Sequence, residues 1–232
     1  MKILAIDTST AACSAALNID NQIVVHFKIA PQGHSELILE QCNELLAKAE
    51  LIPNQLDAIA FGRGPGSFTG LRIAAGVTQG IAFATDLPVI GVSTLAAQAQ
   101  KICLSHPDHL YFSAIDARMK EIYWGVYQLG DNQLVELQGD EAINRPSDID
   151  YHKADTVIGV GSAWKEYPSD LEIALKSSKI SHIYPEILPS AEEIALLAAY
   201  KLQHGDVLDA EKAIPVYLRN DVAKKAIKQP SP

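Results

Sequence analysis

The feature of this 232-residue sequence that most constrains its fold is a glycine-rich segment at positions 62–72, GRGPGSFTGLR. It joins an apolar segment, 58–61, to a run of small and apolar residues, 73–84. This order predicts a buried strand, a tight turn and a helix, the unit from which α/β folds are built. A helix N-terminus after such a turn offers free N–H groups to an anion. A phosphate site is therefore the first function to test.

The glycine segment lacks the residues that known phosphate sites need. A P-loop requires a lysine directly after its last glycine, and no lysine occurs between Lys48 and Lys101. The four glycines also do not follow the G-x-G-x-x-G spacing of dinucleotide-binding loops. The loop therefore either binds something else or shapes the backbone for packing.

Composition limits the classes of function. The net charge of −9 argues against independent binding to nucleic acid, which needs a basic face. Cys13, Cys42 and Cys103 are widely spaced, so they indicate neither a disulfide framework nor a thiolate zinc site. The sequence shows no signal peptide and no apolar run long enough for a membrane helix. We expect a soluble cytoplasmic protein.

The first part of the chain predicts three antiparallel strands followed by alternating helices and strands. The predicted strands are 2–7, 13–19, 23–29, 58–61 and 89–91, and the predicted helices are 35–51, 73–84 and 94–103. Ser35 is predicted to cap the first helix. This order is typical of a ribonuclease H-like half.

The second part repeats this order in shorter form. After a linker, we predict strands at 110–116, 121–128, 134–137 and 156–160 and a helix at 191–204. Asp7 and Asp116 then follow equivalent strands. The chain is predicted to be an α/β protein with two ribonuclease H-like halves, the second reduced, as in actin, sugar kinases and Hsp70. The predicted division is 1–104, joined by a helix near 190–205, then 105–189, then a tail at 206–232.

In that architecture a nucleotide normally sits between the halves, and the residues that would hold it are degraded here. The turn after Asp7 contains no glycine, although Ser9 and its neighbours would stand close to a phosphate. Asp116 is followed by alanine and arginine rather than by a D-x-G turn. Gly159 and Gly161 resemble only part of an adenosine-side loop. We favour the interpretation that Asp7 and Ser9 satisfy backbone donors in a turn, over a working ATPase site.

Other catalytic sites find no support. A helical metal pair that began at His34 would need a second imidazole at position 38, which is isoleucine. Ser67 does not lie in a G-x-S-x-G elbow, so we predict that it caps a helix. No catalytic residue and no metal ligand is predicted.

The predicted helix after the glycine loop has unusually little side-chain volume. Gly76 and Gly80 each cost a helix about 1 kcal/mol relative to alanine. That cost is explained if another backbone comes very close. Burial within the chain and an interface with another protein explain the pattern equally well at this stage. The preceding helix would expose Leu37 or Leu39 beside it.

These segments together resemble the TsaB family, also called YeaZ. The resemblance rests on ILAIDTST at 3–10, HSE at 34–36, the glycine loop, DARMKEIY at 116–123 and PVYLR at 215–219. It spans nearly the whole chain.

The resemblance implies a non-catalytic partner of the paralogue TsaD, which works with the ATPase TsaE. Together they transfer threonylcarbamoyl from its adenylate to N6 of the adenosine just 3′ of the anticodon in tRNA. ATP and metal would be bound by the partner subunits, and tRNA would be contacted indirectly. Members pair with TsaD, or with themselves, through two helices of the first half. Carried onto this chain, the interface residues are Ser35, Leu37, Leu39, Cys42, Leu46, Phe68, Arg72, Ile73, Gly76, Val77 and Gly80.

Two alternatives remain at this stage. One is an ATPase or glycoprotease-type peptidase that acts alone through Asp7, Asp116 and Ser67. The other is a structural homodimer without a catalytic partner. The basic residues near the C-terminus are interpreted as a solvated tail rather than a phosphate contact; they are Lys212, Arg219, Lys224, Lys225 and Lys228.

Overall fold

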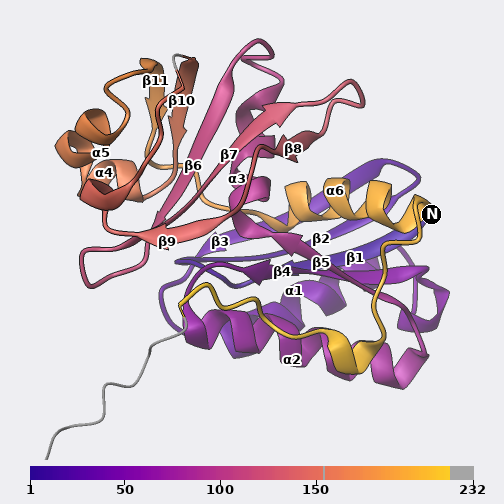
Figure 1. The fold of residues 1–232 in the computed structure, drawn as a ribbon. Helices are drawn as coiled ribbons and strands as arrows, with labels where there is room; N and C mark the ends of the chain where they lie inside the picture. Colours follow the sequence, from indigo (N-terminus) through magenta and orange to yellow (C-terminus); the bar gives the residue numbers. More distant parts are fainter. Residues whose placement is uncertain (154, 220–232) are drawn as a thin grey trace, which may run out of the picture.

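Two β-sheets form the framework of the chain, and the computed structural model describes residues 1–153 and 155–219 (Figure 1). The first sheet has the strand order β3-β2-β1-β4-β5. Its first three strands, β1 (Lys2–Asp7), β2 (Ala12–Ile19) and β3 (Gln22–Ile29), form an antiparallel meander. Two further strands, β4 (Ala58–Gly64) and β5 (Val89–Ser93), extend the sheet in parallel from β1.

The second sheet repeats this arrangement. Its order is β11-β10-β6-β7-β8, with β9 also paired to β7. The antiparallel strands are β6 (Leu110–Asp116), β7 (Ile122–Leu129), β8 (Val135–Leu137) and β9 (Ala142–Asn144). The parallel strands are β10 (Thr156–Val160) and β11 (Lys179–Tyr184). Strand β6 thus corresponds to β1, and the predicted architecture of two ribonuclease H-like halves is confirmed.

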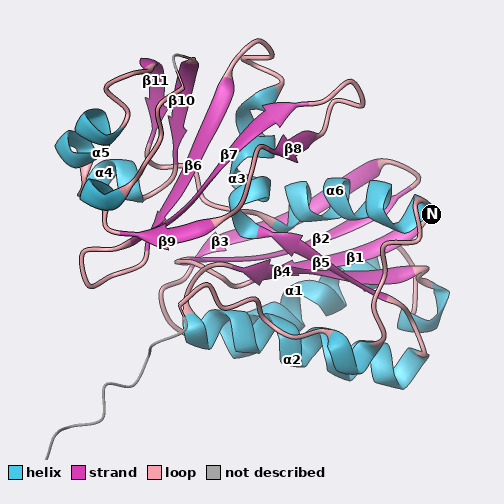
Figure 2. Cartoon of the chain, viewed as in Figure 1, coloured by secondary structure: helices cyan, strands magenta, loops and turns pink. Residues whose placement is uncertain are grey.

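The helices form layers on both sides of each sheet (Figure 2). Helices α1 (His34–Lys48) and α2 (Phe68–Thr85) cover the outer face of the first sheet. The short helices α4 (Ala163–Glu166) and α5 (Pro168–Ala174) cover the outer face of the second. Between the sheets lie α3 (Thr94–Cys103) and α6 (Ala191–Gln203).

The two inner helices are exchanged between the halves. Helix α3 follows the last strand of the first sheet, yet it packs mainly against β6, β7 and β8 of the second. Helix α6 follows the last strand of the second sheet and packs against β1, β2, β4 and β5 of the first. The largest core cluster therefore runs continuously from one half into the other.

The second half is reduced at one place in particular. In the first half, α1 connects the antiparallel strands to the parallel ones. The described residues of the corresponding segment contain only the 3-10 turn η2 (Pro146–Asp148). The other 3-10 turns are η1 (Pro53–Gln55) and η3 (Ala210–Lys212). The domain division at about residues 104 and 190 stays a prediction.

The predicted helix caps had different outcomes. The N-cap of α1 is Gly33, without a side-chain hydrogen bond, so the prediction that Ser35 caps this helix is wrong. Ser35 lies inside the first turn, where it cannot act as the N-cap, and it is exposed. Ser67 is the N-cap of α2 and its hydroxyl accepts a hydrogen bond from Gly70 N at 3.4 Å, as predicted. Among the helices that the structure describes, none is both long and apolar enough to cross a membrane.

Candidate nucleotide site and partner surface

Asp7, at the end of β1, is sealed inside the protein. Its side chain is fully buried, and Oδ1 accepts hydrogen bonds from the Ser9 hydroxyl at 2.9 Å and the Ser9 backbone N–H at 3.2 Å. Oδ2 has no hydrogen-bond partner among the described residues. Burial raises the pKa of Asp7 to about 7, although the two bonds from Ser9 oppose the shift. The predicted Asp7–Ser9 turn contact is therefore present, and half of the carboxyl group remains unsatisfied.

The glycine loop closes directly over this turn. Thr8 Oγ1 donates to the Gly70 carbonyl at 2.7 Å, and the Ser67 N–H donates to the Ser9 carbonyl at 2.7 Å. A Cβ atom on Gly66 would lie 2.5 Å from the Ser9 carbonyl oxygen, and one on Gly70 would lie 1.9 Å from that of Thr8. The space that a phosphate would need between loop and turn is thus filled by backbone contact.

Asp116, the counterpart of Asp7, is held by its own neighbours. Its Oδ1 accepts from the Arg118 N–H at 2.9 Å and from the Tyr167 hydroxyl at 3.2 Å. Its Oδ2 lies 3.3 Å from the Arg118 guanidinium, and its backbone N–H donates to the Ser162 hydroxyl at 3.1 Å. The carboxylate therefore already has a cation and two donors of its own.

Gly159 and Gly161 make room for protein side chains. A Cβ atom on Gly159 would lie 2.5 Å from the indole of Trp164, which is 2% exposed and donates to the Phe112 carbonyl at 3.1 Å. Gly161 has a φ of +98°, and a Cβ there would lie 2.4 Å from the Ala114 carbonyl oxygen. The indole thus occupies the place beside this loop.

The five predicted nucleotide-site positions are therefore committed to contacts within the chain. Asp7, Ser9, Asp116, Gly159 and Gly161 all contact other parts of the fold at close range. No group of three or more histidine, cysteine, aspartate or glutamate side chains is placed to hold a metal ion within residues 1–153 and 155–219.

The predicted interface positions on α2 form an exposed stripe. Arg72, Gly76 and Gly80 are exposed, and Ile73 and Val77 beside them are half-buried. A Cβ atom on Gly76 or Gly80 would meet nothing within 4 Å. Packing within residues 1–153 and 155–219 therefore does not explain these two glycines.

Helix α1 contributes fewer surface residues than predicted. Ser35 and Leu39 are exposed and Leu37 is half-buried. The assignment of Cys42 and Leu46 to a partner surface is wrong, since they are only 3% and 6% exposed. Both lie on the helix stripe that packs against the first sheet, so their side chains point into the core.

Two exposed aromatic residues extend this surface beyond the prediction. The Tyr217 ring lies 5.5 Å from that of Phe68, and the Arg72 guanidinium lies 3.9 Å above the Phe68 ring and donates to the Tyr217 hydroxyl at 3.2 Å. Phe83, 65% exposed, follows Gly80 on the same stripe of α2. The helical spacing of Phe83 was a usable signal, whereas only the fold brings Tyr217 to α2.

The basic residues near the C-terminus that the structure describes have partners within the chain. Lys212 pairs with Asp209 at 2.6 Å. Arg219 pairs with Glu121 at 2.6 Å and donates to the Ala117 carbonyl at 3.0 Å. The remaining three, Lys224, Lys225 and Lys228, lie outside the described residues.

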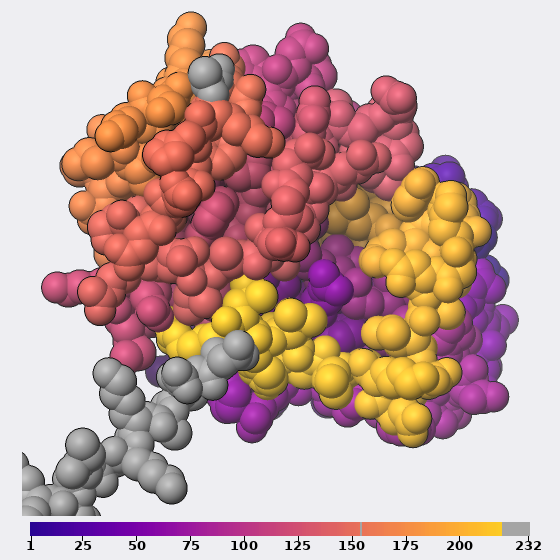
Figure 3. All heavy atoms as spheres, in the orientation of Figure 1, coloured from indigo at the N-terminus to yellow at the C-terminus, as the bar shows by residue number. Residues whose placement is uncertain are grey.

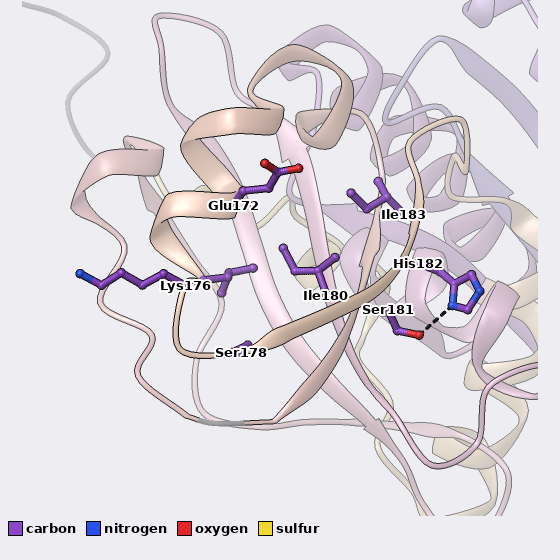
Figure 4. Close-up of a pocket in the computed structure, with 8 residues that line it drawn as sticks. Glu172, Lys176, Ser178, Ile180, Ser181, His182 and Ile183 are labelled. Atoms are coloured by element: carbon purple, nitrogen blue, oxygen red, sulfur yellow. Dashed lines mark hydrogen bonds between the residues drawn. The ribbon is translucent and has the colours of Figure 1, made fainter.

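A shallow groove elsewhere lies along β11 and α5 (Figure 4). Ser181 Oγ lies 2.8 Å from His182 Nδ1 at one end. Figure 4 shows the Glu172 carboxylate at the other end of the groove, well separated from the His182 ring. These residues therefore do not form a serine–histidine–carboxylate triad.

Comparison with known proteins agrees with this architecture. Residues 18–227 match the family model described as "TsaD: tRNA N6-adenosine threonylcarbamoyltransferase". The "tRNA threonylcarbamoyladenosine biosynthesis protein TsaB" of Escherichia coli is 38% identical over 98% of both chains. The protein of that name from Haemophilus influenzae is 37% identical over 98% of this chain and 97% of its own. A solved structure, "YeaZ from Pseudomonas aeruginosa", superposes with a TM-score of 0.84 at 39% identity, covering 94% of this chain and 99% of that one.

Proposed function

Because this chain belongs to the TsaB (YeaZ) family of tRNA threonylcarbamoyladenosine biosynthesis proteins, we propose that it is a non-catalytic subunit that activates a TsaD partner. The proposed complex transfers threonylcarbamoyl to N6 of the adenosine 3′ of the anticodon, in the cytoplasm. TsaE joins the pair, and the chain forms a homodimer when alone. ATP, metal and most of the tRNA contact belong to the partners.

The observation that carries this proposal is the open face of α2. Two glycines in the middle of a helix destabilise it by about 1 kcal/mol each, and neither Gly76 nor Gly80 has a packing neighbour among the residues that the structure describes. A second helix laid across this stripe would find no side chain in its way. Phe68, Arg72 and Phe83 border the stripe with the aromatic and arginine side chains that dominate binding energy at interfaces.

The interior supports the non-catalytic part of the proposal. Oδ2 of Asp7 lies against Gly62, and the Trp164 indole fills the space beside Gly159. A nucleotide would have to displace the glycine loop to reach Asp7, and the indole to occupy the place beside Gly159. These contacts weigh against the alternative, an ATPase or peptidase that acts alone.

The proposal is tested by reconstituted tRNA modification with and without this chain, together with pairing assays. We expect Gly76→Arg and Gly80→Arg to abolish association with TsaD and to lower modification, while the isolated variants remain folded by circular dichroism. Ile173→Arg, at an exposed position on α5, is the matched control and should do neither. If both glycine variants still co-purify with TsaD in full yield, the interface is elsewhere. If modification proceeds equally without the chain, the proposed function is wrong.

Isothermal calorimetry with Mg-ATP separates this proposal from the enzyme alternative. We expect no binding to the isolated chain at micromolar nucleotide. Saturable micromolar binding would favour the ATPase instead.

A further inference from the structure

A cavity of about 250 Å³ lies between the halves, beside the edge strand β5. The polar and aromatic lining includes Arg63 and Ser93 of the first half, Tyr127, Glu136 and Glu141 of the second, and Tyr200 and Lys201 of helix α6, which also contributes Leu197. Figure 3 shows a hollow on this face between the second half, in pink and orange, and α6 with the C-terminal segment, in yellow. None of the five predicted nucleotide-site positions lines the cavity.

Arg63 is directed to this place by a local irregularity in the sheet. The register between β4 and β5 shifts between Gly62 and Gly64, so Arg63 occupies a bulge, a feature that re-aims a side chain. Gly91 on the neighbouring strand leaves room for the Arg63 stem, since a Cβ there would lie 3.3 Å from Arg63 Cδ. Nε of Arg63 is buried without a hydrogen bond, and its guanidinium forms no ion pair with any residue described by the structure. An unpaired guanidinium in a partly enclosed site favours an anion.

Glu141 supplies the opposite charge. Its Oε1 accepts hydrogen bonds from the hydroxyls of Ser93 and Tyr127, and Ser93 also caps the N-terminus of α3. These bonds fix the carboxylate and leave its second oxygen for another donor. Glu141 and Arg63 line the same cavity without forming an ion pair with one another.

Of the four charged residues that line the cavity, Lys201 pairs with Asp206 and Glu136 is exposed. Arg63 and Glu141 are the two half-buried charges without an ion pair among the described residues, and together they select the ligand. A simple anion would meet the Glu141 carboxylate, and a simple cation would meet Arg63. A molecule that carries both charges can satisfy the two residues at once. The cavity volume of about 250 Å³ lies just below the roughly 300–1,000 Å³ that is typical of sites for drug-sized ligands, which favours a small molecule such as one amino acid.

We propose that this cavity binds a free α-amino acid with an apolar side chain. The carboxylate pairs with Arg63, the ammonium group pairs with Glu141, and the side chain packs against Leu134, Leu197 and Tyr200. This proposal does not rest on the proposed function, because it needs neither a partner protein nor tRNA.

In the test, the isolated full chain is titrated with each of the twenty amino acids, and binding is measured by calorimetry and by NMR. We expect one or more apolar amino acids to bind, and their methyl esters and N-acetyl derivatives to bind at least tenfold more weakly. These comparisons use the unaltered chain, so they decide the matter whether or not a variant folds. If none of the twenty binds at millimolar concentration, or if ester and N-acetyl forms bind as tightly as the free amino acid, the proposal is overturned.

Variants locate the site. Arg63→Gln and Glu141→Gln should each weaken binding at least tenfold, while Arg145→Gln and Glu166→Gln, at exposed positions outside the cavity, should leave it unchanged. Glu141→Gln keeps an acceptor for Ser93 and Tyr127, so a loss of binding reports the charge. Unchanged binding in a folded Arg63→Gln variant would overturn the assignment of Arg63 to the amino-acid site. The finding that the cavity binds only a side chain of the partner protein, and no free amino acid, would overturn it as well.

Discussion

Asp7 Oδ2 occupies the space in which a side chain at position 62 would begin, because a Cβ atom on Gly62 would lie 2.0 Å from it. The glycine is thus a packing partner of the carboxylate. The same strand end that presents an aspartate to a ligand in a nucleotide enzyme is here closed by its neighbouring strand. The buried carboxyl group then becomes a determinant of stability.

Asp7 should make stability fall as pH rises. Its pKa is about 7 in the folded chain and 3.8 without burial. Between those values only the folded state holds the proton, so the free energy of unfolding decreases with pH by up to about 1.4 kcal/mol per unit. Asp7→Asn should lose this dependence, and its stability relative to the parent should rise from about pH 4 to about pH 7. Urea unfolding across this range measures the difference.

The exposed Asp131→Asn variant is the control for that series and should follow the parent profile. Parallel profiles for Asp7→Asn and the parent would show that the carboxyl group does not titrate in this window.

Glycines of one helix should respond to alanine in opposite directions. Gly70→Ala would place a methyl group 1.9 Å from the Thr8 carbonyl oxygen and should destabilise the chain by about 3 kcal/mol through overpacking. Gly76→Ala meets nothing within 4 Å and should stabilise the isolated chain by about 0.5–1 kcal/mol. Urea titration of the isolated protein measures both. A destabilised Gly76→Ala would mean that this face is already packed within the chain.

Trp164 offers a direct optical test of the closed nucleotide site. The chain has two tryptophans, and Trp124→Phe leaves only the buried Trp164. We expect its emission to be that of an apolar environment and to stay constant as Mg-ATP is added. Unfolding in urea provides the positive control, since exposure must shift the emission to longer wavelength. A saturable change with nucleotide would contradict the assignment.

The three thiols should be inert in the folded chain. Burial raises the pKa of Cys13 to about 11, that of Cys42 to about 12 and that of Cys103 to about 11. Because the thiolate is the reactive form, a chromogenic disulfide reagent should detect no fast thiol in the native protein and three in urea. A rapid stoichiometric phase without denaturant would show that one cysteine is accessible.

Periodicity and turn residues predicted most of the framework. The bounds of β1, α3, β6 and β10 agree with the predictions, since these elements are long apolar runs or begin at a clear cap. Strands β9 and β11 and helices α4 and α5 were missed. Strand β11 does not alternate between buried and exposed residues, since its neighbouring residues Ile180 and Ser181 are both half-buried. The other three elements are too short to show a helical or strand period.

For the candidate nucleotide site, the sequence predicted only that the residues needed to bind a nucleotide are missing. The sequence shows that the turn after Asp7 has no glycine and that Asp116 lacks a D-x-G turn. What fills the vacated space depends on contacts distant along the chain, such as Thr8 with Gly70. The role of Arg63 depends on a register shift between two strands, which no local pattern indicates.

The exchange of α3 and α6 makes the two halves inseparable as folding units. A chain cut after residue 104 would leave the first sheet without the helix that covers its inner face, and the second fragment would lack α3 in the same way. Each fragment alone would expose a broad apolar surface to water. When the two fragments are produced together, they should associate and restore the native fold. The two halves repeat the same strand order, but they form one folding unit.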